Sequence, residues 1–285
     1  MIGPRRRRRL AALAALAAAP LAFAGPPLRV ASINLAADEV LVELLPPERL
    51  VSVTRWVDDS QNSNVVGRVP ASVYRIQKAD MERLVALDPD LVVVSEYTDA
   101  DFLELLQRSG LRWHRMQGLD SMAGIREAIL RLGEAVEAPD RARELVARYD
   151  ATLAEVKQRL GDAPRPRVLY WSAPMTAGAG TAIGSLIECA GGANVGRDLG
   201  IDGIAPVGAE RAFAADPDVV LVGSWDGSRR ALVDHPLLAR MRAVRDGRIV
   251  ELPTRQLVAL SQFSADACWS LAHLLHPRLL PKRQP

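Results

Sequence analysis

One pattern occurs twice in the chain: Glu82-Arg-Leu-Val-Ala-Leu-Asp-Pro-Asp-Leu-Val-Val-Val94 aligns without a gap to Glu210-Arg-Ala-Phe-Ala-Ala-Asp-Pro-Asp-Val-Val-Leu-Val222. Each copy begins as a short helix, which ends at the Asp-Pro-Asp turn because proline cannot continue helical hydrogen bonding. Each copy then continues as a run of apolar, mostly β-branched residues, which is typical of a buried strand in a parallel sheet. The sequence therefore contains one architectural unit twice.

Predicted strands and helices alternate on both sides of this unit. Apolar runs predict strands over residues 30–33, 50–53, 91–94, 113–115, 167–171, 219–222 and 249–252. Helical patterns between them include residues 181–190, 237–244 and 263–275. Strand-helix-strand alternation indicates right-handed crossovers and parallel sheets. We predict an α/β protein of two Rossmann-like lobes with mostly parallel sheets and a ligand cleft between the lobes. The expected boundaries are 25–119 for the N-terminal lobe and 164–285 for the C-terminal lobe.

The segment between the lobes, residues 120–163, is expected to be helical. Its apolar residues from Ile125 to Val156 keep helical spacing, with one interruption at Glu137-Ala-Pro-Asp140. The pattern predicts one long helix instead of a flexible hinge. A stiff connection of this kind predicts only a small closing motion of the lobes.

The N-terminus has the features of a cleaved export signal over residues 1–24. Arg5 to Arg9 precede an apolar stretch, and Ala22-Phe23-Ala24 forms a cleavage site. No cysteine directly follows the apolar stretch, so we expect a free periplasmic protein and not a lipoprotein, exported by the general or the twin-arginine route.

Removal of the signal also changes the charge of the chain, because loss of its five arginines turns the formal net charge of +2 into −3. A weakly acidic chain without basic clusters argues against nucleic acid as a partner. No later stretch is long enough for a membrane helix.

The two cysteines, Cys189 and Cys268, are expected to form a disulfide in an oxidising compartment, with two buried thiols as the alternative. Apart from one pair near a helix end, the four histidines lack metal-ligand spacing. The sequence therefore predicts no metal site and no resident cofactor.

Further stretches carry a resemblance to a known family: Arg29-Val-Ala-Ser-Ile-Asn-Leu-Ala-Ala-Asp-Glu39, Pro46-Pro-Glu-Arg-Leu-Val-Ser-Val53, Thr176-Ala-Gly-Ala-Gly-Thr181 and Leu186-Ile-Glu-Cys-Ala-Gly-Gly-Ala-Asn194. With the repeat, these make the chain resemble the helical-backbone class of periplasmic binding proteins from about Leu28 to Leu275. The resemblance implies the substrate-binding component of an ABC transporter. Such a protein would capture a metal chelate and deliver it to an inner-membrane permease. The expected chelate is cobalamin, another corrinoid or a ferric siderophore.

The resemblance also implies roles for particular residues. Glu82 and Glu210 match the acidic residues through which the family docks on its dimeric permease, which a monomer can match by presenting the same contact twice. Their other explanation is a favourable interaction of glutamate with a helix N-terminus. Cys189 fits the cysteine context of the vitamin B12-binding branch, and this match weakly favours a corrinoid as the ligand. Cys268 lies about one helical turn before the position expected for its partner.

Ligand-binding candidates follow from position, because ligands of open α/β sheets bind beyond the carboxyl ends of the strands. Aromatic rings and guanidinium groups there suit a broad, flat, partly anionic ligand. These candidates are Trp56, Tyr74, Arg75, Tyr97, Trp171, Trp225 and Arg255. Haem is the alternative ligand, since haem-binding relatives use a tyrosine near the position of Tyr74, here offset by about one residue.

Rival functions have weaker support in the sequence. Gly178-Ala-Gly180-Thr-Ala-Ile-Gly184 resembles a dinucleotide-binding turn of an exported enzyme, but its third glycine comes one residue late. No Gly-x-Ser-x-Gly motif of a hydrolase is present. A sensor or scaffold with the same fold would not need both Glu82 and Glu210. We therefore expect no enzymatic activity and assign no catalytic residue.

Overall fold

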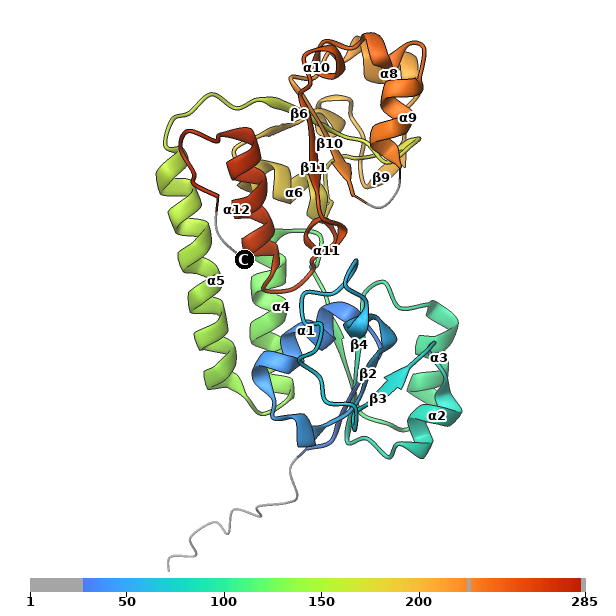
Figure 1. The fold of residues 1–285 in the computed structure, drawn as a ribbon. Coiled ribbons are helices and arrows are strands. Elements are labelled where there is room, and N and C mark those ends of the chain that lie inside the picture. Colours follow the sequence, from blue (N-terminus) through green and yellow to red (C-terminus); the bar gives the residue numbers. More distant parts are fainter. Residues whose placement is uncertain (1–27, 225–226, 283–285) are drawn as a thin grey trace, which may run out of the picture.

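The structure, a computed structural model, describes residues 28–224 and 227–282, which fold into two lobes (Figure 1). The expected signal peptide, residues 1–24, and the ligand candidate Trp225 lie outside the described residues. None of the helices in the described part combines the length and apolar character that crossing a membrane requires.

A five-stranded parallel sheet forms the centre of the N-terminal lobe, in the order β3-β2-β1-β4-β5. Its strands are β1 (Val30–Ser32), β2 (Leu50–Thr54), β3 (Tyr74–Ile76), β4 (Leu91–Ser95) and β5 (Trp113–Met116). Helix α1 (Leu35–Leu44) packs on one face of the sheet. Helices α2 (Met81–Ala86) and α3 (Ala100–Arg108) pack on the other face.

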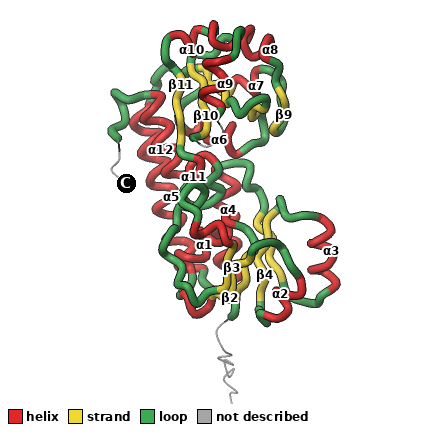
Figure 2. The backbone as a smooth tube through the Cα atoms, turned by 45° about the vertical axis from the view of Figure 1, so that its right-hand side comes forward, coloured by secondary structure: helices red, strands yellow, loops and turns green. Residues whose placement is uncertain are grey.

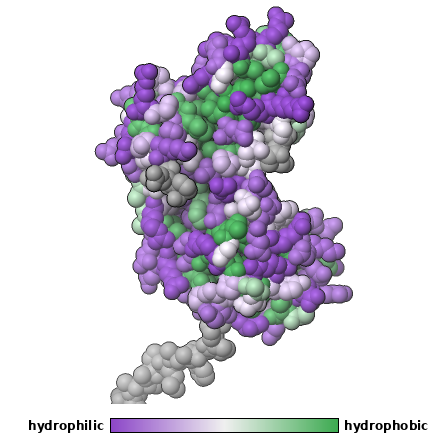
Figure 3. Space-filling model, in the orientation of Figure 1, coloured by the Kyte–Doolittle hydropathy of each residue, from purple (hydrophilic) through white to green (hydrophobic). Residues whose placement is uncertain are grey.

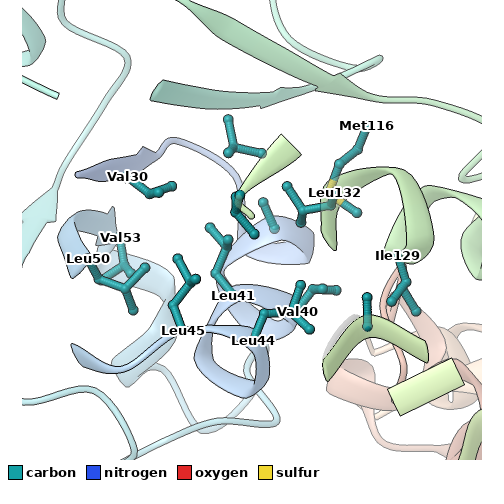
Figure 4. Close-up of a cluster of buried hydrophobic side chains, with 14 of the residues drawn as sticks. Val30, Val40, Leu41, Leu44, Leu45, Leu50, Val53, Met116, Ile129 and Leu132 are labelled. Atoms are coloured by element: carbon teal, nitrogen blue, oxygen red, sulfur yellow. The ribbon is translucent and has the colours of Figure 1, made fainter. Parts of the chain in front are cut away.

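The main core of this lobe lies between the sheet and α1 (Figure 4). Val40, Leu41 and Leu44 follow helical spacing and are at most 1% exposed. They share one cluster with Val30 of the sheet and with Ile129 of the linking segment. Because burial of each such side chain stabilises the fold by about 1.5–3 kcal/mol, this cluster fixes α1 firmly on the sheet.

The C-terminal lobe contains a four-stranded parallel sheet in the order β11-β10-β6-β8. Its strands are β6 (Arg167–Tyr170), β8 (Ala193–Asn194), β10 (Val219–Gly223) and β11 (Ile249–Leu252). Its helices are α6 (Ala182–Cys189), α7 (Val195–Asp198), α8 (Ala209–Ala214), α9 (Ser228–Asp234), α10 (Arg242–Arg245), α11 (Thr254–Leu257) and α12 (Ser264–Leu275). A separate antiparallel ribbon pairs β7 (Met175–Ala177) with β9 (Ile204–Pro206).

The predicted fold class, two α/β lobes with mostly parallel sheets, is confirmed. The sequence did not predict the edge strand β3 or the ribbon of β7 and β9. The helix expected over residues 237–244 is wrong in part: a 3₁₀ turn, Leu238–Arg240, is separated from α10 because Met241 between them has non-helical backbone angles, φ −56° and ψ 142°.

The repeated units form α2 with β4 and α8 with β10, and their turns share one unusual conformation. Asp88 and Asp216 have φ values of 48° and 41°. Both lie in the left-handed region, which aspartate tolerates better than most residues other than glycine. Each places its proline at the point where the chain turns from helix into strand.

A hydrogen-bonded clamp follows each of these turns. The carboxylate of Asp90 accepts the backbone N–H of Arg29 at 2.7 Å, and that of Asp218 accepts the backbone N–H of Arg167 at 2.8 Å. The guanidinium groups of both arginines donate to carbonyl groups at the ends of α2 and α8. The first strand of each lobe, β1 or β6, is thereby tied to the neighbouring repeat strand, β4 or β10.

The linking segment differs from the single interrupted helix that the sequence predicted. Residues Met122–Ala135 form α4 and Pro139–Leu160 form α5, and the two pack against each other in opposite directions. Close approach is possible because Gly133 has no side chain: a Cβ there would lie 2.2 Å from that of Ala142. The interruption therefore reverses the chain. Helix α5 runs from the N-terminal core to the C-terminal core, and Met122 at the start of α4 also packs against the C-terminal core.

Helix α12 lies beside α5 and α6 in the C-terminal lobe (Figures 1 and 2). Cys268 of α12 and Cys189 of α6 form a disulfide across a sequence separation of 79. Closing a loop of that length restricts the unfolded chain and stabilises the fold by about 2–4 kcal/mol in typical cases. The bond holds the last helix on the C-terminal lobe.

The clamps predict that Asp90→Ala and Asp218→Ala each lower the free energy of unfolding by about 1–2 kcal/mol, because each removes a carboxylate from a backbone N–H. Urea unfolding of the mature protein measures this change. The exposed Asp162→Ala serves as the control and should stay within about 0.5 kcal/mol of the parent. Equal stability of all three variants would show that the clamps do not hold the strands.

Candidate functional site

Both sheets have a point at which the winding direction of the chain reverses. In the N-terminal lobe this point lies between β1 and β4, and in the C-terminal lobe between β6 and β10. Ligands of open α/β sheets bind beyond the carboxyl ends of the strands at such a point. The surface is deeply hollowed between the two lobes (Figure 3). The fold therefore places the candidate site in this cleft.

A pocket of about 240 Å³ forms the floor of the cleft. Its N-terminal wall includes Asn34–Ala36 and Glu39 at the start of α1, Ser95 at the end of β4 and Tyr97 just after it. Residues 258–260 of the C-terminal lobe close the other side. Most ligand sites have about 300–1,000 Å³, so a broad ligand would also occupy the open hollow beside this pocket.

Of the predicted ligand residues, Tyr97 lines this pocket and Trp56 is exposed beyond the carboxyl end of β2. Tyr97 is 62% exposed and Trp56 41% exposed, so both rings are accessible to a ligand. The guanidinium of Arg55 lies 4.3 Å from the indole centroid of Trp56. Desolvation raises the pKa of Tyr97, and nearby Glu96 adds to this effect. Tyr97 is therefore a neutral phenol near neutral pH.

Tyr74 and Arg75 do not line this pocket and instead contact other residues of the N-terminal lobe. Tyr74 lies in the edge strand β3, where the guanidinium of Arg83 stands 5.1 Å from its ring centroid. Arg75 forms a two-pronged ion pair with Asp58 and donates its remaining N–H groups to three backbone carbonyls. All five donors of Arg75 are thus used inside the lobe, where they organise the loop before β3.

Trp171 and Arg255 also lie away from the floor of the cleft. Trp171 is only 4% exposed and belongs to a buried cluster of the C-terminal lobe. Arg255 is exposed in α11, but it lines a second hollow of about 1020 Å³, between residues 60–66 and the segment from β11 to α12. The structure therefore does not bring the six candidates that it describes together around one pocket.

The glycine-rich turn before α6 has a structural role. A Cβ at Gly178 would lie 2.0 Å from the carbonyl oxygen of Ile201, so only glycine fits there. The hydroxyl of Thr181 accepts the N–H of Gly184 and thereby caps α6. Close packing and capping account for this motif without a bound nucleotide.

Two buried carboxyl groups of α1 were missed by the sequence analysis. Asp38 is 0% exposed and accepts the N–H and hydroxyl of Thr54 at 3.0 and 2.6 Å. Burial raises the pKa of Asp38 to about 7. Glu39 is 2% exposed, and burial raises its pKa as well. Adjacent acids inside an otherwise apolar helix pattern were the available signal.

A protein-family model described as periplasmic binding protein matches residues 30–256. The chain belongs to this family. Its members are binding proteins and not enzymes, and they act outside the cytoplasm with the permeases of ABC transporters. Family membership agrees with the resemblance that the sequence motifs indicated.

The names of individual relatives of this periplasmic binding protein state what those relatives bind. A cobalamin-binding protein of Halobacterium salinarum is 28% identical over 251 residues, which cover 81% of this chain but only 64% of the relative. The chain thus spans less than two thirds of that protein.

The similarity to two solved structures extends over nearly the whole of each solved chain. A periplasmic haem-binding protein of Pseudomonas aeruginosa is 26% identical with a TM-score of 0.73, covering 91% of this chain and 96% of that one. A periplasmic haem-binding protein from Roseiflexus sp. RS-1, in apo form, is 24% identical with a TM-score of 0.74, covering 88% and 99%. The Roseiflexus likeness supports the fold alone.

Glu82 and Glu210 occupy equivalent places in this binding protein. Each is the second residue of a short helix, α2 or α8, and both are exposed. The two helices belong to different lobes and lie on the side of the molecule opposite α5 (Figure 1). Within the described residues, no cluster of three or more His, Cys, Asp or Glu could hold a metal ion.

The raised pKa of Asp38 gives a prediction for the pH dependence of stability. Between about pH 4 and about pH 7 the folded protein holds a proton on Asp38 that the unfolded chain releases, so rising pH favours unfolding by at most about 1.4 kcal/mol per pH unit. Asp38→Asn removes this contribution, so the variant should gain stability relative to the parent as the pH rises through this window. Urea unfolding at several pH values measures the difference, with Asp162→Asn as the control. A difference that stays constant with pH would contradict burial of an ionisable Asp38.

Proposed function

We propose that this protein is the periplasmic substrate-binding component of an ABC transporter, and that it captures a corrinoid or another metal chelate in the cleft between its lobes. The observation that carries the proposal is the position of the floor pocket. It lies at the reversal point of the N-terminal sheet, and the C-terminal lobe closes its other side. A ligand there would contact both lobes at once, which is how a two-lobed carrier recognises its cargo.

The choice of a corrinoid rests on two observations. The Halobacterium relative is named as a cobalamin-binding protein, and the disulfide joins Cys189, which fits the cysteine context of the vitamin B12-binding branch, to Cys268 on the last helix. A ferric siderophore is a further metal-chelate candidate for the same cleft. Haem is the second candidate, supported by the Pseudomonas relative. The neutral phenol of Tyr97 would contribute a ring face and a hydrogen bond to any of these ligands.

The supporting features for the cellular location are the signal-like residues 1–24 and the disulfide. We propose that the chain is cleaved after Ala24 and works as a soluble monomer in the periplasm. In that compartment the cleft would load its ligand and present it to a permease dimer in the inner membrane. The lobes act as a carrier without catalysis.

Titration calorimetry with cyanocobalamin, haemin and a ferric hydroxamate siderophore tests the ligand proposal on the mature protein. At least one ligand is expected to bind with a dissociation constant of about 1 µM or below. Tyr97→Ala should weaken that binding about 10-fold to 100-fold, because a ring that the ligand would cover is lost. The matched control Tyr74→Ala removes a tyrosine outside the pocket and should leave the affinity unchanged. The site assignment fails if Tyr74→Ala weakens binding and Tyr97→Ala does not. If none of the three ligands binds, the metal-chelate proposal itself is wrong.

The docking role of Glu82 and Glu210 is tested by uptake. The variant with both Glu82→Ala and Glu210→Ala should lose ligand uptake in cells that express the cognate permease, because each lobe loses its carboxylate contact. Ligand affinity of the purified variant should not change. Glu134→Ala with Glu144→Ala removes two exposed carboxylates from the linking helices and serves as the charge-matched control. Normal uptake by the first variant would refute the docking assignment.

A further inference from the structure

A buried polar contact joins the two lobes beneath the cleft. The carboxylate of Glu39 in α1 accepts the hydroxyl of Ser261 at 2.5 Å, and the backbone carbonyl of Glu39 accepts the side-chain amide of Gln262 at 2.8 Å. Ser261 and Gln262 belong to the segment between α11 and α12. Ser261 is fully buried and Gln262 is 8% exposed. The contact therefore lies in the interior between the lobes and not on the surface.

Asn64 of the N-terminal lobe completes this contact. Its backbone N–H and its side-chain amide both donate to the second carboxylate oxygen of Glu39, at 2.8 and 2.9 Å. The same side-chain amide donates to the carbonyl of Arg255 in α11 at 2.8 Å. We name Glu39, Asn64, Ser261 and Gln262 the inter-lobe clasp. In it, one carboxylate collects donors from both lobes.

Apolar contacts support the clasp on the same segment. Leu260 and Phe263 flank Ser261 and Gln262, and both pack against the core of the N-terminal lobe. Beyond them, Ala267 and Cys268 of α12 belong to the core of the C-terminal lobe. Residues 258–263 therefore cross from one core to the other, as α5 does elsewhere in the molecule.

The burial of Glu39 makes its hydrogen-bond donors necessary. A buried carboxyl group is tolerated only where donors satisfy it, and removing one donor leaves an oxygen without a partner. If the lobes moved apart at this point, Glu39 would lose Ser261 while staying buried in α1. Because Glu39 also lines the floor pocket, the contact sits where the width of the cleft is set.

We propose that Glu39 is a positioning residue whose carboxylate holds residues 258–263 on the N-terminal lobe and so fixes the width of the cleft before any ligand enters. With the clasp and α5 at separate places, the lobes are joined at two points and cannot swing freely about one. A carrier built in this way presents a preformed site and recognises ligand shape with little closing motion. This inference does not depend on which ligand the cleft takes.

Distances between spin labels on the two lobes test the proposal. Gln107→Cys on α3 and Ala231→Cys on α9 provide exposed labelling sites across the cleft, while the native cysteines stay paired. The parent should give one narrow distance distribution without ligand. Ser261→Ala removes the hydroxyl that reaches Glu39, so the distribution should broaden and its mean should move by several ångströms. Glu39→Gln should act in the same direction, and combining it with Ser261→Ala should add little.

Ser52→Ala is the matched control, because Ser52 is fully buried in β2 and its hydroxyl bonds to no residue of the clasp. It should leave the distribution unchanged. If Ser261→Ala does not fold, Gln262→Met removes the amide donor to the Glu39 carbonyl with a side chain of similar size and should still broaden the distribution. Lower stability of the clasp variants with an unaltered distance distribution would overturn the proposal, since a purely structural role predicts that result.

Discussion

The binding of two backbone N–H groups, those of Arg29 and Arg167, by the carboxylates of Asp90 and Asp218 is the constraint from which the rest of the molecule follows. Each bond ties the first strand of a lobe to its repeat strand at their amino ends. Those strand pairs, β1 with β4 and β6 with β10, flank the points where the chain reverses its winding direction. Since each strand pair is fixed at its amino end, the loops that follow the two strands lie together at the carboxyl end, where they can form a site. The duplicated Asp-Pro-Asp turn thus determines the position of the cleft.

Two connections then set how the lobes face each other. The antiparallel pair α4 and α5 supplies a stiff rod, and the clasp around Glu39 supplies a second junction beneath the cleft. Both use a strict local requirement: glycine at position 133 for close helix packing, and satisfied donors for a buried carboxylate. Such requirements favour one arrangement of the lobes over a continuum. A preformed cleft of this kind suits a rigid, broad ligand, which gains affinity when little ordering is needed on binding.

The sequence was sufficient for the features that depend on local pattern. The repeat and the apolar runs predicted most strands of the two parallel sheets and the division into two lobes, and the oxidising compartment suggested the disulfide. Side-chain partners depend on tertiary distance, which a pattern does not contain. Arg75 and Trp171 both lie near the ends of strands. The guanidinium of Arg75 nevertheless bonds to Asp58 and to backbone carbonyls, and the ring of Trp171 packs in a buried cluster. The helix reversal after α4 was misread because an interruption looks the same in sequence whether the chain continues or turns back. Glu39 was overlooked because its partner Ser261 lies 222 residues away.

In the proposed complex, one ligand is held between the carboxyl ends of both sheets. Hydrogen exchange measured by mass spectrometry, with and without the chelate that binds, tests this arrangement. We expect slower exchange on ligand binding in residues 34–39 and 95–98 of the N-terminal lobe together with residues 253–260 of the C-terminal lobe. Slower exchange confined to one lobe, or centred on residues 266–274 along the larger hollow, would contradict it.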